Sequence, residues 1–587
     1  MAGPELDLSD LTSQAVDNLV TQFASHLDFY RELVQNSIDA GSAAIDVWME
    51  YIAGEGDQGT IAIHVDDSGD GMTEAIIDDQ LTKLFASAKE GDLTKIGKFG
   101  IGFVSVFACR PKAVLVHTGR DGESWEVCFD ADRSFVKARL DAPVDGTQIT
   151  LFLEGDRGRY GELVEASRRT LERWCSHSDV DVTFEDRSAP AGGAAEALTR
   201  PFAVEGEPMV RVEVEGAEIV AAHGERPVYG FYNKGLALAV SSDAATILGD
   251  RAGRFEHVAF KIKSRYLEHT LSRDTVVRDA NYEKAMAMVE AAVAGPLQDA
   301  LVSGLAALAK APAWGIAEAE RYFRWIGALA REPIAEVMRH QGVPFLRTLA
   351  GRPLALAEVE RAAVYGERLF ISDAPSILSE HLAAEGVAVL FGRRPAGDGV
   401  EGFGEVGRLV VACLAFVRRA SLGGRARGAL GYDHWAACSK MLAAPERELF
   451  AVEVEGAGEP AVDGLIADAA RLLASAGVRY RRVVGARLAL GDPAAPLAVF
   501  APTVGRFMAR RSLDARGVGL GPVEVAVNRG HAQVLALARL RGRSPALAAY
   551  CLAKDLLRAE ERAAGLDLDL MAAALPEVRG AYAEAGR

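Results

Sequence analysis

The sequence lacks any run of about 18 consecutive apolar residues, the length that a membrane-spanning helix needs. Its start, MAGPELDLSD, is acidic and does not show the basic and then apolar order of a secretory signal. Cysteine is scarce, with 6 residues in 587 and no CxxC pair, so neither a zinc site nor a disulfide framework is indicated. These absences predict a cytoplasmic protein without a membrane partner.

Long basic runs are also missing. Lysine and arginine number 65 against 82 aspartate and glutamate residues, and the net charge is −17 at pH 7. Two compact basic clusters occur, over 479–487 and 506–516. We interpret them as solvated faces, with a nucleic-acid patch as the alternative. The acidic average field argues against nucleic acid as a partner.

What is present is the composition of a globular protein, 49% hydrophobic and 25% charged, at a length typical of about three to five domains. A helix is predicted over 27–40. Alternating apolar residues then predict successive strands to about residue 154, including TIAIHVDD, KAVLVHTG, SWEVCFD and TQITLFLE. This order is typical of an α+β fold and not of alternating βαβ units.

Later segments suggest further domains. An Ala-, Gly- and Pro-rich stretch over 186–201 reads as a linker, a strand-rich unit follows to about 275, and the pattern turns helical from about 280. Mixed segments between about 345 and 500 suggest a smaller α/β unit. We therefore predict an α+β multidomain chain with boundaries at 1–190, 200–345, 346–500 and 501–587.

The helix RELVQNSIDA, residues 31–40, places three polar residues on one narrow face. Glu32, Asn36 and Asp39 stand at i, i+4 and i+7. An ordinary amphipathic helix with a solvated side would also explain this stretch when it is taken alone. The alternative is a row of acceptors that faces a ligand.

Two glycine clusters follow this helix, DDSGDGMT at 66–73 and IGKFGIGF at 96–103. Glycines at such spacing let backbone N–H groups approach phosphate oxygens closely. Neither cluster fits the common nucleotide fingerprints. Lys98 is followed by Phe99, which excludes a Walker loop, and no βαβ unit surrounds Gly100 to support a dinucleotide site.

The order of the elements resembles the ATPase superfamily of gyrase, heat-shock protein 90, histidine kinases and MutL (GHKL, the Bergerat fold). The matching elements are RELVQNSIDAG, DDSGDGMT, IGKFGIGFVSVFA and the trailing strand DGTQITLFL. The glycine loop IGKFGIGF is closest to the heat-shock protein 90 form. The resemblance implies an N-terminal Bergerat-fold α/β sandwich that binds ATP and Mg²⁺, an α/β middle domain and a mostly helical C-terminal dimerisation domain.

The resemblance also implies roles for the helix. Glu32 would be the general base that activates the attacking water. Asn36 would coordinate Mg²⁺ through its carbonyl oxygen. Asp39 and Arg31 would support this face.

Further roles follow for the nucleotide pocket. Asp67 would accept the adenine amino group, and Gly71, Met72 and Thr147 would line the base pocket. Gln80 stands where the heat-shock branch has asparagine. A turn-forming aspartate after a strand is the alternative reading of Asp67.

The glycine loop and the segment before it would enclose the phosphates. Gly97, Gly100, Gly102 and Phe103 would close over them, and residues from about 76 to 99 would form a mobile lid. Lys89 resembles a lid lysine that meets phosphate in several branches of the superfamily. A solvent-facing lysine is the alternative.

One distant segment helps to choose the branch. YLEHTLSRDTVVRD, residues 266–279, resembles the middle-domain segment of heat-shock protein 90 that carries an arginine to the γ-phosphate, a place held here by Arg273. The alternative is a surface arginine paired with Asp274 or Asp279. The segment at 525–557 resembles the dimerisation module of the same family.

The expected function is an ATP-driven chaperone, a homodimer through its C-terminal domain whose ATP hydrolysis drives clamp closure on client proteins. The competing hypothesis is a MutL-like or other GHKL ATPase that acts on nucleic acid or in defence. The passage DAGSAAIDV, which leads directly from helix to strand as in MutL, keeps that alternative open.

Overall fold

The structure is a computed structural model that describes most of the chain. The described residues are 25–54, 57–82, 101–189, 193–270, 275–364, 368–393, 404–421, 434–445, 449–454, 456, 458–489, 495–510, 523–557 and 564–585. The chain divides into two compact units, Met1–Ala300 and Leu301–Arg587. This division is coarser than the four predicted domains.

The first unit begins with an eight-stranded sheet in the order β5-β4-β3-β6-β2-β1-β7-β8. All neighbouring strands are antiparallel except β1 and β7, which run parallel. The predicted strands are confirmed within a residue or two. The strands are β1 (Ala44–Ala53), β2 (Gly59–Asp67), β3 (Ala113–Arg120), β4 (Glu123–Asp130), β5 (Phe135–Arg139), β6 (Gly146–Gly155), β7 (Asp181–Asp186) and β8 (Glu196–Ala197).

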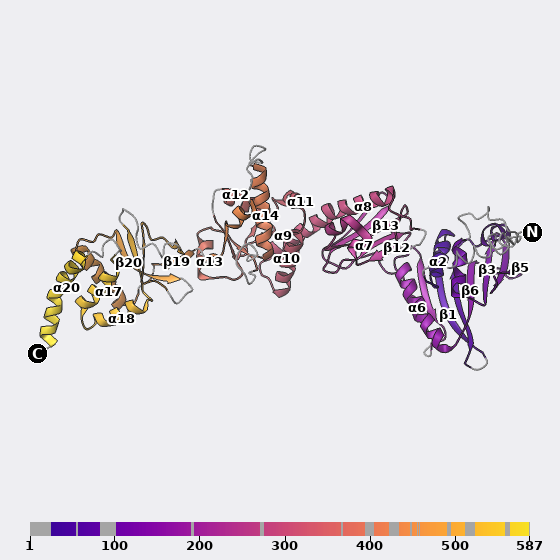
Figure 1. The fold of residues 1–587 in the computed structure, drawn as a ribbon, viewed down its shortest axis with the longest axis horizontal. Helices are drawn as coiled ribbons and strands as arrows, with labels where there is room; N and C mark the ends of the chain where they lie inside the picture. Colours follow the sequence, from indigo (N-terminus) through magenta and orange to yellow (C-terminus); the bar gives the residue numbers. More distant parts are fainter. Residues whose placement is uncertain are drawn as a thin grey trace, which may run out of the picture. The chain divides into compact units, whose positions relative to one another are not determined.

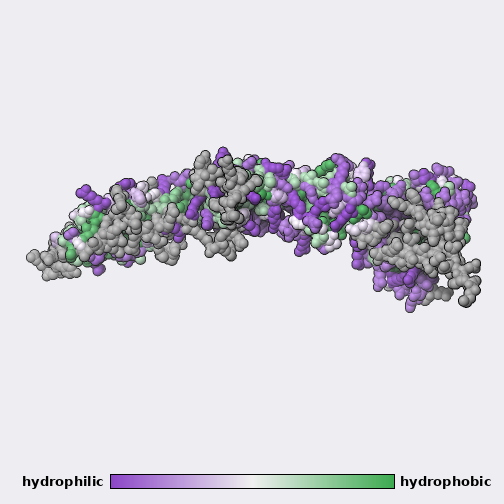
Figure 2. All heavy atoms as spheres, turned by 45° about the horizontal axis from the view of Figure 1, so that its top comes forward, coloured by the Kyte–Doolittle hydropathy of each residue, from purple (hydrophilic) through white to green (hydrophobic). Residues whose placement is uncertain are grey.

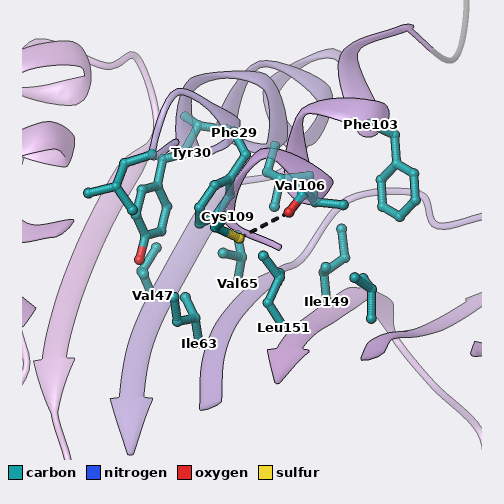
Figure 3. Close-up of a cluster of buried hydrophobic side chains, with 14 of the residues drawn as sticks. Phe29, Tyr30, Val47, Ile63, Val65, Phe103, Val106, Cys109, Ile149 and Leu151 are labelled. Carbon is teal, nitrogen blue, oxygen red and sulfur yellow. Dashed lines mark hydrogen bonds between the residues drawn. The ribbon is translucent and has the colours of Figure 1, made fainter. Parts of the chain in front are cut away.

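Helices cover one face of this sheet (Figure 1). The predicted first helix is confirmed as α2 (Phe29–Asp39), and α6 (Arg157–Cys175) packs beside it. Phe29 and Tyr30 of α2 point toward Val47, Ile63 and Val65 of the sheet (Figure 3), and all five are buried. Apolar residues at alternate strand positions thus make the inner face, as the period of a half-buried strand requires.

Shorter helical turns complete this face. The structure contains α3 (Glu74–Ile76) and a π-helical turn η1 (Ile77–Leu81), where the segment predicted as the lid begins. The next described residues form α5 (Ile101–Val104) and the 3₁₀ helix η3 (Ser105–Cys109). Most of the predicted lid therefore lies outside the described residues.

The other face of the sheet carries a stack of rings. Trp48 and His64 lie with ring centroids 3.3 Å apart, and Thr150 bonds the Nδ1 atom of His64 at 3.0 Å. Burial, aided by the charge of Arg187, lowers the pKa of His64 from 6.5 to about 4. Glu50, 3.6 Å from Nε2, favours the protonated ring, but burial outweighs this attraction.

The stability of the first unit should therefore depend on pH through His64. Because the folded pKa lies below the unfolded value, the contribution of the neutral ring is complete above pH 6.5 and is lost as pH falls toward 4, at about 1.4 kcal/mol per pH unit. His64→Phe should flatten the pH dependence of the calorimetric midpoint in this range. An unchanged pH dependence of the midpoint in His64→Phe would contradict this role of His64.

A second sheet completes the first unit, with the order β12-β11-β13-β10-β9. Its core includes Phe231, Phe260 and Tyr282, and the helix α8 (Ala280–Ala292) packs against it. The elements are β9 (Met209–Val214), β10 (Ala217–His223), β11 (Tyr229–Asn233), β12 (Leu236–Ser241), α7 (Ala244–Leu248), η4 (Gly249–Arg254) and β13 (Val258–Ser264). The strand-rich unit predicted here is confirmed.

One long helical segment, Ala280–Lys310, is long and apolar enough to cross a membrane by length and composition. It consists of α8, the π-helical turn η5 (Val293–Leu297) and α9 (Gln298–Lys310). Buried side chains of α8 belong to the core of the second sheet, and Leu301 and Leu305 of α9 belong to a core of the second unit. A core helix meets the same criteria of length and composition.

The second unit contains a helical core with small sheets. This core runs from Leu301 to Leu442 without a break at the predicted boundary of 345, because Phe345 and Leu346 are buried in it. Its elements are α10 (Ile316–Leu329), α11 (Ile334–Val337), η6 (Met338–His340), β14 (Leu346–Arg347), β15 (Pro353–Leu354), α12 (Leu356–Val364), β16 (Leu369–Ser372), α13 (Ile377–Ala384), β17 (Val389–Phe391), α14 (Gly404–Ser421), α15 (His434–Ser439) and β18 (Leu442–Ala443).

The chain ends in a five-stranded sheet, β21-β23-β20-β19-β22, followed by helices. The predicted boundary at 500 falls inside this sheet, because β20 pairs with β23. The elements are β19 (Leu449–Glu453), α17 (Pro460–Ser475), β20 (Arg482–Ala489), β21 (Ala498–Ala501), β22 (Phe507–Ala509), β23 (Glu524–Asn528), α18 (Ala532–Arg541), α19 (Pro545–Asp555) and α20 (Ala564–Ala585). The fold is thus mixed α+β with a helical C-terminal region.

Candidate functional site

The acidic face of α2 is partly buried and partly open. Glu32 is buried, with 9% of its surface exposed, whereas Asn36 and Asp39 are exposed. Gly102 in α5 passes directly over the Glu32 carboxylate. A Cβ atom at residue 102 would lie 2.6 Å from Oε2 of Glu32, closer than carbon and oxygen can approach. Glycine therefore allows the chain to pass this carboxylate.

The outer end of the same face is held from two sides. Oδ1 of Asp39 accepts hydrogen bonds from Nε2 of Gln35 at 3.1 Å and from Nζ of Lys234 at 2.6 Å. Gln35 precedes Asp39 by one helical turn, whereas Lys234 comes from the second sheet. The Asp39 carboxylate is thus already occupied by partners within the protein.

Asp67, at the end of β2, is the centre of a small hydrogen-bond network. Ser37 Oγ donates to Oδ2 at 2.8 Å, while the backbone N–H groups of Gly69 and Thr147 donate to Oδ1 at 2.9 and 3.2 Å. A carboxylate offers about four acceptor positions, and donors among the described residues fill three of them. The network therefore fixes the carboxylate, and these three donors leave room for one further hydrogen bond.

Two buried threonines extend this network into the sheet. Thr118 and Thr147 face each other across β3 and β6, with their hydroxyl oxygens 3.0 Å apart, and Thr118 Oγ1 accepts from the backbone N–H of Met72 at 2.9 Å. Gly71 has φ +68°, and a Cβ there would lie 2.1 Å from the Gly119 carbonyl oxygen. The turn after β2 thus packs against β3 backbone to backbone, which only glycine allows.

Arg31 supports the helix from the other side. Its side chain is 5% exposed and its guanidinium lies 4.8 Å from the ring centroid of Trp174. Burial lowers the pKa of Arg31 to about 10. Burial, followed by the charge of Arg31, also lowers the pKa of His269. The charge of Arg31 thus acts on the segment at 265–270.

The remaining predicted residues lie in different surroundings. Phe103 is 4% exposed and packs against Phe107 and Phe129, so its side chain is part of the core (Figure 3). A phosphate contact from this residue would have to use its backbone N–H. Gln80 is exposed on η1. Lys89, Gly97, Gly100 and Arg273 lie outside the described residues.

The structure thus places Gly102 against Glu32 in the first turn of α2. Near the last turn, Ser37 bonds Asp67, and the threonine network links Asp67 to Met72 and Thr147. Sequence reasoning missed three residues of this site, which are Ser37, Thr118 and Lys234. Ser37 directly follows a motif residue, and a hydroxyl at that place is a signal that could have been used. Thr118 and Lys234 carry no local signal, because strand pairing and sheet packing bring them to the site.

Comparison with known families gives one match. Residues 30–152 match the family described as histidine kinase-, DNA gyrase B- and HSP90-like ATPase. This range begins in α2 and ends in β6, so it contains the described site except for Lys234. The chain therefore carries a GHKL-type ATPase domain at its N-terminal end.

Curated relatives are similar over the same part of the chain. The chaperone protein HtpG of Bacteroides thetaiotaomicron is 25% identical over 195 residues, which cover 30% of this chain and 28% of that protein. HtpG of Anaplasma phagocytophilum is 30% identical over 238 residues, 35% and 36% of the two chains. The chloroplastic heat shock protein 90-5 of Arabidopsis thaliana is 30% identical over 200 residues, 28% and 25% of the two chains.

The likeness is therefore partial. The chain spans between 25% and 36% of the length of these relatives. This partial likeness supports an ATPase domain of this type and a weaker similarity to HtpG and heat-shock protein 90 chaperones.

Proposed function

We propose that the protein is an ATP-dependent chaperone similar to heat-shock protein 90, in which ATP hydrolysis drives the closure of a dimeric clamp on client proteins. The observation that carries this proposal is the buried Glu32 carboxylate held against Gly102, within the segment that matches the ATPase family. A carboxylate on a rigid helix beside a glycine-rich turn suits the activation of water near a phosphate.

The hydrolytic step would belong to Glu32. Its carboxylate would orient a water molecule and accept its proton as that water attacks the γ-phosphate. Low solvent exposure of Glu32 favours this task, because a base that is shielded from bulk water keeps its geometry. Gly102 lies against this carboxylate, and its backbone N–H would lie near the phosphates.

The nucleotide would be held by Asn36 and Asp67. Asn36 is exposed at one turn from Glu32, and its carbonyl oxygen is a suitable ligand for Mg²⁺ that also binds phosphate oxygens. Asp67 has three donors among the described residues, and its fourth acceptor position would fit the exocyclic amino group of adenine. Thr147 and Met72 border that position through the threonine network.

The second sheet would supply Arg273. The described residues on either side of it are paired by the bridge between His269 and Val276 and by the hydrogen bond from Thr270 N–H to Thr275 O at 2.9 Å. The charge of Arg31 on α2 acts on His269. The role of Arg273 at the γ-phosphate rests on the resemblance of its segment, and a guanidinium there would stabilise developing charge.

Client binding and dimerisation belong to the second unit in this proposal. Hydrophilic residues form most of the face in Figure 2 that is not grey, with hydrophobic residues among them in small groups. The exposed large apolar side chains of the second unit are the candidate client contacts, and they include Ile316, Val387, Trp435, Leu568 and Met571. The region 501–587 is the proposed dimerisation domain.

The full chain tests this proposal in three assays. We expect Mg²⁺-dependent ATP hydrolysis, ATP-dependent suppression of the aggregation of a chemically unfolded protein, and no salt-dependent binding to duplex DNA. DNA binding that weakens steeply with salt, without protection of the unfolded protein, would instead support the nucleic-acid alternative. Absence of ATP binding would contradict the whole proposal.

A further inference from the structure

Two hairpins of the second sheet end in turns of the same geometry. The turn between β11 and β12 has φ +47° at Lys234 and +79° at Gly235, and the turn between β9 and β10 has +48° at Glu215 and +77° at Gly216. Positive φ at both central residues is the type I′ turn that suits two-residue hairpins. The two turns therefore have the same backbone conformation.

Their surroundings differ sharply. A Cβ atom at Gly216 would meet no atom closer than Arg265 Nε at 3.9 Å, so that turn is open. A Cβ atom at Gly235 would lie 1.9 Å from the carbonyl oxygen of His177 and 2.7 Å from Cα of Ser178. The Lys234–Gly235 turn is thus seated on the backbone that follows α6.

Hydrogen bonds fix this seat. The Lys234 carbonyl accepts from the backbone N–H of Asp179 at 3.2 Å, and the Asp179 side chain accepts from Lys263 at 2.9 Å. Asn233 Nδ2 donates to the carbonyl of Leu267 at 2.8 Å, which joins the turn to the segment after β13. One turn therefore contacts both the end of α6 and the segment at 265–270.

The same turn reaches the acidic face of α2. Lys234 Nζ donates to Asp39 Oδ1 at 2.6 Å, and Gln35 holds the same oxygen from within the helix. Asp39 lies two turns after Glu32 on that face. A lysine from the second sheet thus holds the helix that carries the proposed general base.

We propose that Lys234 is a positioning residue of the ATPase, which holds Asp39 and so fixes α2 relative to the second sheet. The inference rests on the proposed function. In this arrangement Asp39 anchors the second sheet and does not contact the nucleotide. Seating of the turn would set the geometry of hydrolysis without changing the affinity for ATP.

Single substitutions in the full chain give the first test. The Lys234 and Asp39 side chains are 44% and 54% exposed, and a pair this open shifts an equilibrium by at most about fivefold. Lys234→Ala should therefore lower kcat by about three- to fivefold with KM unchanged, and Lys234→Arg should restore it. Glu215→Ala, at the matching place of the open turn, should have no effect.

Paired glycine substitutions give the sharper test. Gly235→Ala and Gly216→Ala place the same side chain at the same positive φ, so the backbone strain is equal and cancels in the comparison. Gly235→Ala should also displace the turn from the backbone of His177 and Ser178, because the added Cβ atom would clash with it. Hydrogen exchange of the Asp179 amide, bonded to the Lys234 carbonyl, should accelerate by at least about tenfold in Gly235→Ala and stay unchanged in Gly216→Ala.

The exchange rate of the Asp179 amide and kcat, measured together, show whether the inference holds. Equal exchange and equal kcat in both glycine variants would overturn the inference, and so would faster exchange in Gly235→Ala with unchanged kcat. A chain that neither binds nor hydrolyses ATP would contradict the proposed function itself. The exchange of the Asp179 amide would then still report on the seating of the turn, and a positioning role in hydrolysis would be refuted together with the hydrolysis.

Discussion

Glu32→Ala should lower the rate of ATP hydrolysis by about 10²- to 10⁴-fold, the typical contribution of a general base. The affinity for ATP should remain close to that of the wild type, because in the proposed site this carboxylate acts on the water and not on the nucleotide. Steady-state hydrolysis together with calorimetric titration of ATP measures both quantities. This is the largest effect expected of any single substitution in the chain.

Two further variants control this result. Glu32→Gln keeps the size of the side chain but removes the basic oxygen, so it should be as inactive as Glu32→Ala while the packing against Gly102 is kept. Glu50→Ala removes a half-buried carboxylate from β1 and should leave hydrolysis unchanged. If Glu32→Gln retained most of the wild-type rate, Glu32 would not be the base.

Asp67→Asn should weaken ATP binding by about 10- to 150-fold, which corresponds to the 1.5–3 kcal/mol of a hydrogen bond to a charged group. The folded structure should tolerate the change. The remaining carbonyl oxygen can still accept from Gly69 and Thr147, and the new amide can donate to Ser37, whose hydroxyl can then donate to the Leu33 carbonyl at 3.0 Å. The loss should therefore fall on the nucleotide.

Discrimination between ATP and GTP is the decisive measurement for Asp67. The wild type should prefer ATP strongly, because Asp67 accepts from the adenine amino group, whereas guanine presents an oxygen at the corresponding position. The preference should largely disappear in Asp67→Asn, with the melting temperature nearly unchanged. An unaltered preference for ATP would place adenine recognition elsewhere in the protein.

Local pattern was enough to predict the elements that position the site. The strands β1 to β4 and β6 alternate apolar and polar residues, because one sheet face is buried, and α2 shows an apolar side that includes Phe29, Leu33 and Val34. α6 was not predicted, although the sequence carries signals for it. Asp156 caps its first turn by accepting from Arg159 N–H at 2.7 Å, and Tyr160, Leu163 and Val164 recur at helical spacing.

Domain boundaries were harder, because they depend on contacts between distant residues. The linker predicted at 186–201 contains β8, which pairs with β7 and adds a strand to the first sheet. Composition alone marks such a stretch as a connection, since Ala, Gly and Pro are frequent in it. The cores that cross residues 345 and 500 have no signature in composition either.

In the candidate site, too, some residues stand in local motifs and others are brought together only by contacts between distant segments. Glu32, Asn36 and Asp67 stand in motifs that can be recognised within short stretches of sequence. The pair of Asp39 and Lys234 joins residues 195 positions apart, and the Thr118–Thr147 contact depends on the register of β3 and β6. No local pattern encodes either contact, so the structure was needed to find them.

The parallel pairing of β1 with β7 has a consequence for the order in which the chain is made. Asp46 of β1 meets Thr183 of β7, 137 residues later, so one edge of β1 stays open during synthesis until β7 has left the ribosome. An open edge rich in apolar residues is a template for wrong strand pairing between nascent chains. A protein that we propose to protect other chains from aggregation would pass through a stage in which its own first sheet needs the same protection.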